Sequence, residues 1–398
     1  MADSFLRRFA NVATLKEISQ EHLLLFFNPF KDYLAGRGYQ LPSNPTEGID
    51  CEALVAILLN PTRDMPPHLA QRLYLVHEMA TDHGMQELLN AVPPGLLSFG
   101  GLDPTPADVA LQVLLKDHEL LERKHAEQFL VRTKSFYVCQ GSGVPRDDLP
   151  DCPAEIMQAI ALEFDDWFEE NRRGRGSKVF VFPRRDDGEV WFLVRHGLAM
   201  RRQGSLDNGE SSSIFFRPEV FDVVVYHRVQ DALIVHISPY VKSIRELYRK
   251  VLGRRIFGHE DYFAADGNYT LLPLQARRSG ALDFSGIKGI EDVTLHEIEI
   301  FVSKGSGVFF DLRGDDVFCY LDESKMDLPK GFWSKAVFWI EFSDAKTPRA
   351  VTIRPPSRTN FARDDDRSLI ERFLAQNGFV LNAKEEASEE AEAPVGRA

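Results

Sequence analysis

Apolar residues recur at intervals of three and four over residues 1–135, which is the spacing of amphipathic helices. The first apolar stripe comprises Leu15, Ile18, Leu23, Phe26 and Phe27. Further segments with this spacing lie at about 51–59, 66–82 and 106–131, and proline-rich turns separate them. We therefore expect the N-terminal part of the chain to be helical.

The tetrapeptide Thr105-Pro106-Ala107-Asp108 is the clearest start signal of a helix in this part. A threonine hydroxyl can cap the first turn, and proline is favoured at the first helical position because no N–H is needed there. The carboxylate of Asp108 comes two residues later, near the positive end of the helix, where negative charge is stabilised. These residues predict that a helix begins at about residue 106.

A polar stretch with Pro145, Pro150 and Pro153 follows Gly141-Ser142-Gly143 and predicts an inter-domain connection. A strongly amphipathic helix is then predicted at 154–171. Its apolar stripe consists of Ile156, Ile160, Phe164 and Trp167. The acidic residues of the same segment lie mostly elsewhere around the helix, so we expect them to be solvated.

From residue 177 the pattern changes to short β-branched and aromatic runs, which are typical of strands. These runs lie at 178–182, 190–194, 221–227 and 232–237, with hairpin turns at 185–188 and 229–231, and a basic helix follows at 243–257. A second block has strand candidates at 295–302, 307–312, 317–321, 337–342 and 350–354, and then a helix at about 364–377. Strands joined by hairpins favour a mainly antiparallel sheet, so the predicted class is α+β.

The pattern predicts a helical domain at 1–140, a linker with the amphipathic helix at 141–176, and an α+β domain at 177–380. The α+β domain contains two β-rich halves, 177–258 and 290–378, which would fit an internal duplication, although no repeat of individual residues supports it. Residues 381–398 are rich in Glu, Ala and Ser and have little apolar surface, so we expect a disordered acidic tail.

The composition is that of an ordinary globular protein. The chain has 398 residues, of which 44% are hydrophobic and 27% are charged. It has no uninterrupted apolar run of about 18 residues, and it does not begin with the basic-then-apolar order of a secretory signal. We expect a soluble protein without membrane contact.

The number and spacing of the cysteines bear on the cellular compartment of the protein. Cys51, Cys139, Cys152 and Cys319 are widely and irregularly spaced, without a CxxC motif. This spacing argues against a zinc site and against a disulfide framework, and it suits a reducing cytoplasm.

Charge is unevenly distributed along the chain. The net charge is −13, but residues 172–278 contain 19 Lys and Arg against 12 Asp and Glu, a net of +7. The candidate anion-binding residues in this region are Arg172, Arg173, Arg175, Arg201, Arg202, Lys242, Arg245, Arg249, Lys250, Arg254 and Arg255. On a helix Lys242, Arg245 and Arg249 share one face, so they could follow a phosphate backbone. The region predicts contact with nucleic acid or with an acidic protein surface.

The segment Trp191-Phe192-Leu193-Val194-Arg195-His196-Gly197 resembles the strand-then-RHG opening of the histidine phosphatases. The resemblance covers about seven residues and implies that His196 takes a phosphoryl group while Arg195 binds its oxygens. That family also needs a second histidine on a later strand, for which His236 is the downstream candidate. The alternative is that Arg195 and His196 simply end a hairpin strand before a turn at Gly197.

A metal-dependent nuclease is a further alternative. Asp311, Asp315 or Asp316, followed by Glu323-Ser324-Lys325, would place an acid ahead of an E-x-K on adjacent strands. The competing interpretation is a hairpin turn at 314–316 and a loop at 323–326. The glycine-rich pieces at 141–143 and 305–307 lack the lysine and hydroxyl residues of a phosphate-binding Walker loop.

We expect a non-enzymatic binding or accessory protein, such as a component of a bacterial multi-protein system. The helical part would bind a protein partner, and residues 172–278 would contact nucleic acid or an acidic surface. A homo-oligomer is compatible with this interpretation. No cofactor and no resident metal are expected. The two enzymatic alternatives are a phosphate-handling enzyme with Arg195 and His196, and the nuclease.

Overall fold

A computed structural model describes residues 6–381 except residues 101–102, 132–134, 143–149, 151, 186–187, 208, 229, 238, 265–267, 304–306 and 362–365. Apart from its first residue, the expected acidic tail at 381–398 lies outside the described residues. The chain divides into two compact units, Met1–Phe129 and Leu130–Ala398. No helix in the described part is both long enough and apolar enough to cross a membrane.

The first unit is built from helices that begin at polar capping residues. Side chains of Asn11, Ser19, Asp50, Thr81 and Thr105 each accept a hydrogen bond from a backbone N–H of the first turn. The helices are α1 (Val12–Glu17), α2 (Gln20–Phe27), α3 (Lys31–Gly36), α4 (Cys51–Leu58), α5 (Pro67–Met79), α6 (Asp82–Ala91), α7 (Pro106–Lys116) and α8 (His118–Val131), with short 3₁₀ turns at Asn28–Phe30 and Pro45–Glu47. Their apolar faces form one core.

Polar residues also explain where the helices are shorter than the apolar spacing suggests. Ser19 caps α2, so the stripe from Leu15 to Phe27 is divided between α1 and α2. The predicted segment 106–131 is likewise two helices, which meet at Asp117. The side chain of Asp117 accepts a hydrogen bond from the backbone N–H of Leu120 at 3.0 Å and so favours a new first turn. The helix start predicted at residue 106 is confirmed.

The second unit contains a sheet of ten strands in the order β2-β3-β6-β7-β1-β12-β11-β10-β8-β9. Every described pairing in this sheet is antiparallel, so the α+β class is confirmed. The strands are β1 (Ser135–Gln140), β2 (Lys178–Arg184), β3 (Glu189–Gly197), β6 (Glu219–His227), β7 (Ala232–His236), β8 (Ile290–Ser303), β9 (Val308–Arg313), β10 (Phe332–Phe342), β11 (Arg349–Arg354) and β12 (Arg358–Asn360). β1 lies within the range predicted to be helical, yet it pairs with β7 and β12 and so joins the two β-rich halves.

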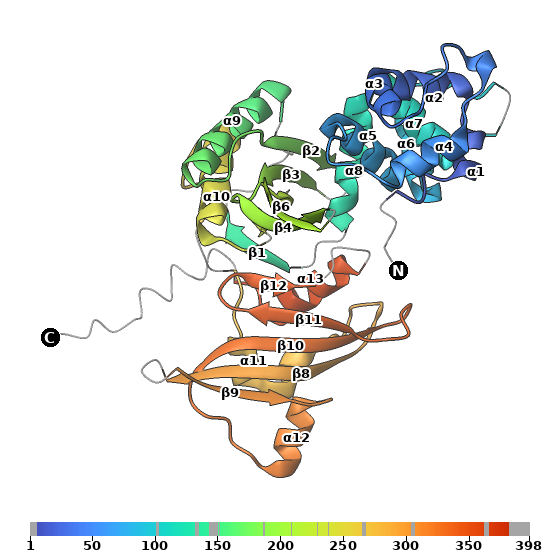
Figure 1. Cartoon of the computed structure of the whole chain (residues 1–398). Helices are drawn as coiled ribbons and strands as arrows, with labels where there is room; N and C mark the ends of the chain where they lie inside the picture. Colours follow the sequence, from blue (N-terminus) through green and yellow to red (C-terminus); the bar gives the residue numbers. More distant parts are fainter. Residues whose placement is uncertain are drawn as a thin grey trace. The chain divides into compact units, whose positions relative to one another are not determined.

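Helices cover the two halves of the sheet separately (Figure 1). α9 (Ala154–Glu170) and α10 (Lys242–Phe257) pack on β3, β6, β7 and β1 through one apolar core. α13 (Arg367–Gln376) packs on the other half, where Phe373 contacts Phe338 of β10 at 5.9 Å between ring centroids. The remaining elements are α11 (Leu272–Arg277), a 3₁₀ helix at Arg278–Leu282 and α12 (Val317–Ser324).

The predicted strand at 317–321 is wrong, because these residues form the first turns of α12. Asp316 caps this helix by accepting hydrogen bonds from the N–H groups of Phe318 and Cys319 at 2.9 and 3.1 Å. The buried residues of α12 are Val317, Phe318 and Leu321. Their spacing is helical, although the β-branched and aromatic run favours a strand when it is considered alone.

Candidate nucleic-acid interface

A two-stranded ribbon extends from the first half of the sheet. β3 pairs with β6 as far as Gly197 and Glu219, and Leu198 then donates a backbone hydrogen bond to Pro218 at 2.8 Å. The pairing resumes between β4 (Arg201–Asp207) and β5 (Glu210–Phe216), which form a sheet of their own. Arg201 and Arg202, two of the candidate anion-binding residues, therefore lie on a strand.

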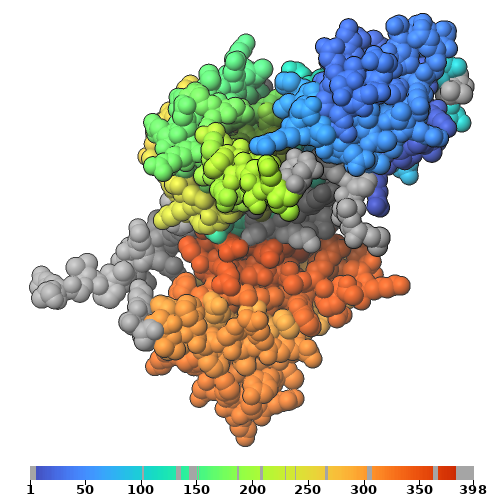
Figure 2. Space-filling view, in the orientation of Figure 1, coloured from blue at the N-terminus to red at the C-terminus, as the bar shows by residue number. Residues whose placement is uncertain are grey.

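Large side chains of this ribbon are exposed to solvent. Leu206, Ile214, Phe215 and Phe216 are between 40% and 73% exposed, so no core fixes the ribbon. The yellow-green atoms of this segment lie at the surface in Figure 2. Exposed apolar side chains on one element mark a candidate contact surface, and here they lie on both faces of the ribbon, Ile214 and Phe216 on one and Leu206 and Phe215 on the other.

Each face of the ribbon presents one arginine opposite one phenylalanine. Arg201 pairs with Phe216 across the strands, and Arg202 pairs with Phe215. Cross-strand partners share a face and successive residues alternate between faces, so the two pairs lie on opposite faces. Arg202 is also oriented by a hydrogen bond that its Nε donates to Ser213 Oγ at 2.8 Å.

The loop after α9 lies against the base of the ribbon. Asp165 fixes this loop, because its carboxylate accepts hydrogen bonds from the backbone N–H groups of Gly176 and Ser177 at 2.8 to 3.1 Å. A Cβ added at Gly174 would lie 3.0 Å from Nε of Arg217, so the loop backbone directly contacts that side chain. The loop and the ribbon therefore bring together arginines that are far apart in the sequence.

We define the cationic patch by the arginines of this loop and of the ribbon base. Its members are Arg172, Arg173, Arg201, Arg202 and Arg217. Among the side chains that the structure describes, no carboxylate oxygen lies within 4.0 Å of these guanidinium groups. The patch therefore retains its positive charge for an external anion.

Four of the other predicted cations, Arg175, Lys250, Arg254 and Arg255, are neutralised by carboxylates. Glu163 of α9 forms ion pairs with both Arg254 and Arg255 of α10, and Glu260 contacts Lys250 at 2.8 Å and Arg254 at 2.9 Å. The hydrogen bond with Glu260 raises the pKa of Lys250. In the loop after α9, Arg175 contacts Asp166 at 2.9 Å and Glu169 at 2.8 Å. These residues stabilise contacts within the unit rather than add to the patch.

Two of the three residues predicted to share a basic helix face are buried. Arg245 is 3% exposed, and it lies over the ring of Tyr137 with its guanidinium carbon 5.4 Å from the ring centroid. Arg249 is 7% exposed, contacts Glu246 at 3.1 Å and donates a hydrogen bond to the carbonyl of Phe263. Of these three residues, only Lys242, the first residue of α10, is exposed.

The residues of the RHG segment do not converge on one site. Arg195 and His196 are adjacent on β3, so their side chains lie on opposite faces of the sheet. Arg195 contacts Glu219 at 3.5 Å, whereas Nε2 of His196 donates a hydrogen bond to Asp222 at 2.9 Å and its ring stacks on Phe168 with 4.2 Å between centroids. His196 is 4% exposed, so its ring nitrogens are not accessible to a substrate. His236, the second histidine considered, ends β7.

The residues of the nuclease alternative lie around α12. Asp315, Asp316 and Glu323 line one hollow of about 570 Å³. Asp316 caps the helix, Asp311 binds Arg313 at 2.8 Å, and Lys325 is the left-handed residue that ends α12. Within the described part of the chain, no group of three His, Cys, Asp or Glu residues is arranged to bind a metal ion.

The ribbon and its phenylalanines were not predicted from the sequence. The ribbon has no buried face, so the alternation of apolar and polar residues that indicates a strand is absent. One signal was available, since Asn208-Gly209 separates the two strands in the sequence and this dipeptide favours a tight hairpin.

Comparison with known protein families finds no family that matches the chain, and comparison with curated proteins finds no match. The function proposed below therefore depends on the geometry of the site.

Proposed function

We propose that the chain is a non-enzymatic accessory protein that binds nucleic acid through the cationic patch. The observation that supports this function is the contrast between five arginines without a described carboxylate partner and the paired cations of α10. Guanidinium groups bind phosphate oxygens in a fork-shaped geometry, and neutralisation of phosphates supplies much of the affinity for nucleic acid.

The exposed phenylalanines favour a single-stranded ligand. Phe215 is 63% exposed and Phe216 is 40% exposed, and each lies opposite an arginine on the ribbon. Unpaired bases can stack on an aromatic ring while a neighbouring cation binds the backbone, whereas the bases of a duplex are already stacked on each other. The ribbon therefore suits a single strand that passes its base.

As an accessory protein, the chain would also bind a protein partner, and we assign this contact to the helical unit. This unit contains 10 Lys and Arg against 17 Asp and Glu, so it repels nucleic acid and suits a basic partner. No disulfide joins the four cysteines, all of which lie in the described part of the chain, and two of them are buried. Reduced cysteines support a reducing compartment such as the cytoplasm.

The test is the salt dependence of binding to a labelled oligothymidylate, measured by fluorescence anisotropy. The variant Arg172→Gln/Arg201→Gln/Arg202→Gln/Arg217→Gln should bind at least about tenfold more weakly, because it loses phosphate contacts. Each lost contact should also reduce the slope of log K against log salt by about 0.7 in magnitude. A separate Phe215→Ala/Phe216→Ala variant should weaken binding with little change of that slope, since stacking does not involve counterions.

The matched control is Arg175→Gln/Lys250→Gln/Arg254→Gln/Arg255→Gln, which removes the same charge from cations that already have carboxylate partners. This control should change affinity less than about twofold. Equal weakening by both variants would show that net charge alone determines binding, and would contradict the assigned patch. Displacement of the oligonucleotide by polyglutamate at equal charge would favour an acidic protein as the ligand instead.

A further inference from the structure

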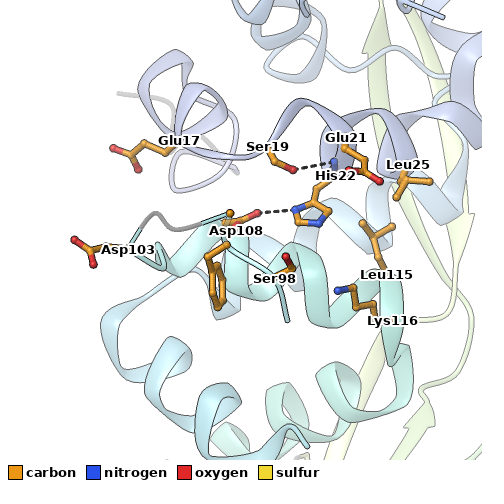
Figure 3. Close-up of a pocket in the computed structure, with 12 residues that line it drawn as sticks. Glu17, Ser19, Glu21, His22, Leu25, Ser98, Asp103, Asp108, Leu115 and Lys116 are labelled. Carbon is orange, nitrogen blue, oxygen red and sulfur yellow. Dashed lines mark hydrogen bonds and ion pairs between the residues drawn. The ribbon is translucent and has the colours of Figure 1, made fainter. Parts of the chain in front are cut away.

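A hollow of about 590 Å³ lies in the helical unit (Figure 3). Its walls come from the start of α2, from α7 and from the segment that contains Phe99. This volume is within the range of small-ligand sites, which is roughly 300 to 1,000 Å³. The hollow is therefore large enough for a small molecule or for a long side chain of a partner.

One wall holds an imidazole in a fixed orientation. Nδ1 of His22 lies 3.2 Å from Oδ1 of Asp108, and the dashed line in Figure 3 marks this contact. Gln112 donates a hydrogen bond to the second carboxylate oxygen of Asp108 at 2.9 Å, and it also bonds the backbone N–H and carbonyl of Ser98. Asp108 is 7% exposed, so the carboxylate is held in place on both oxygens.

The hydrogen bond to Asp108 determines what His22 can offer a ligand. An ionised carboxylate only accepts hydrogen bonds, so Nδ1 of the neutral imidazole must carry the proton. Nε2 is then an acceptor, and no partner for it lies among the described residues. His22 lines the hollow, so Nε2 is the ring nitrogen left for a ligand.

The other polar groups of the hollow are also mainly acceptors. The exposed carboxylates of Glu17, Glu21 and Asp103 line it. The ammonium group of Lys116 donates to the carbonyl of Leu96 at 2.6 Å, so the one lysine of the lining already has an acceptor. A ligand must therefore supply hydrogen-bond donors, and positive charge on it is favoured.

Apolar side chains form the rest of the surface. Leu25 is 56% exposed, and Leu115 and Phe99 also line the hollow. A short alkyl chain could cover these groups while its charged end reaches the acceptors.

From the hollow, the oriented imidazole and the set of acceptors, we infer that this site binds an organic cation, namely a guanidinium or ammonium group on a short alkyl chain. The cation could be a free small molecule or the end of a basic side chain on a partner polypeptide. This inference concerns the first unit and does not depend on nucleic-acid binding by the second.

The probes are agmatine, which has a guanidinium group on a four-carbon chain, and the peptide Gly-Gly-Arg-Gly-Gly with blocked ends. Binding to the full chain is measured by titration calorimetry and by the imidazole ¹⁵N resonances in NMR spectra. At least one probe should bind and should shift the Nε2 resonance of His22. Tighter binding of the peptide would identify a polypeptide as the source of the cation, and tighter binding of agmatine a free small molecule.

His22→Gln and Glu21→Gln should each weaken binding at least about fivefold, because the first replaces the oriented Nε2 acceptor with a flexible amide and the second removes a negative charge. Glu21 is exposed, so its variant tests the site without disturbing the core. The matched control Glu52→Gln alters an exposed glutamate in the first turn of α4 and should leave binding unchanged. No binding of either probe at about 10 mM, a concentration that reveals weak sites, would overturn the inference. Equal weakening by the control would overturn it too.

Discussion

A histidine is hydrogen-bonded to an aspartate in both units of this protein, and the surroundings of these two pairs differ. In the second unit His196 contacts Asp222 at 2.9 Å, and in the first unit His22 contacts Asp108 at 3.2 Å. Asp222 is fully buried and also accepts a hydrogen bond from Tyr248 at 2.8 Å. The other pair lines a hollow at the surface.

Two pairs of the same residue types, histidine and aspartate, therefore differ in whether a ligand can reach them. Phe168 stacks on His196 with 4.2 Å between ring centroids, so the core of α9, α10 and the sheet encloses the His196–Asp222 pair. Such a buried polar group costs free energy unless its partners remain in place. We therefore expect the His196 pair to affect stability and the His22 pair to affect binding.

The largest expected effect is that of Asp222→Ala, which would leave both His196 and Tyr248 without their partner in the core. Each buried polar group without a partner costs about 1 to 3 kcal/mol, so the second unit should lose about 3 to 5 kcal/mol of stability. Urea unfolding followed by tryptophan fluorescence measures this unit alone, because it contains all four tryptophans, Trp167, Trp191, Trp333 and Trp339. The exposed Asp292→Ala is the control, and equal losses in both variants would contradict the role of Asp222.

A smaller effect is expected for Asp108→Ala in the other pair. His22 borders the hollow, where water can replace the carboxylate, and Gln112 keeps its two hydrogen bonds to Ser98. The first unit should therefore lose about 1 to 2 kcal/mol. Circular dichroism at the helix band should report this loss, while tryptophan fluorescence should not change its midpoint. A loss as large as that of Asp222→Ala would show that the two pairs are equally structural.

Local patterns in the sequence predict the elements of this fold better than they predict its surface. The helix at residue 106 follows from Thr105 and Pro106, which act within one turn. The pairing of Glu163 with Arg254 and Arg255 joins residues 91 and 92 positions apart, so no local pattern indicates that these cations are neutralised. The stretch 317–321 shows the same limit, because its strand-like composition is overridden by the cap at Asp316.

The candidate sites depend on such distant contacts even more strongly. His22 and Asp108 are 86 residues apart, and the local pattern around Asp108 indicates only a favourable charge at a helix start. The cationic patch was predicted in part, since Arg172, Arg173, Arg201 and Arg202 were named. Arg217 was missed because a single arginine beside a proline has no distinctive pattern, and only the fold places it against the loop at Gly174.

The smallest effect at neutral pH is expected for Tyr248→Phe, which removes one hydrogen bond to Asp222 and keeps the aromatic packing against Phe164. The loss of unfolding free energy should be about 1 kcal/mol.

Burial raises the pKa of Tyr248 well above its usual value, and the negative charge of Asp222 raises it further. A raised pKa in the folded state means that the unfolded chain loses this proton first, so the wild type loses stability as the pH rises above about 10. The phenylalanine variant lacks this titration, and its deficit relative to the wild type should shrink between pH 9 and about 11 when unfolding is followed by tryptophan fluorescence. A deficit that stays constant over this range would mean that Tyr248 ionises equally easily in both states, and would contradict its enclosure beside Asp222.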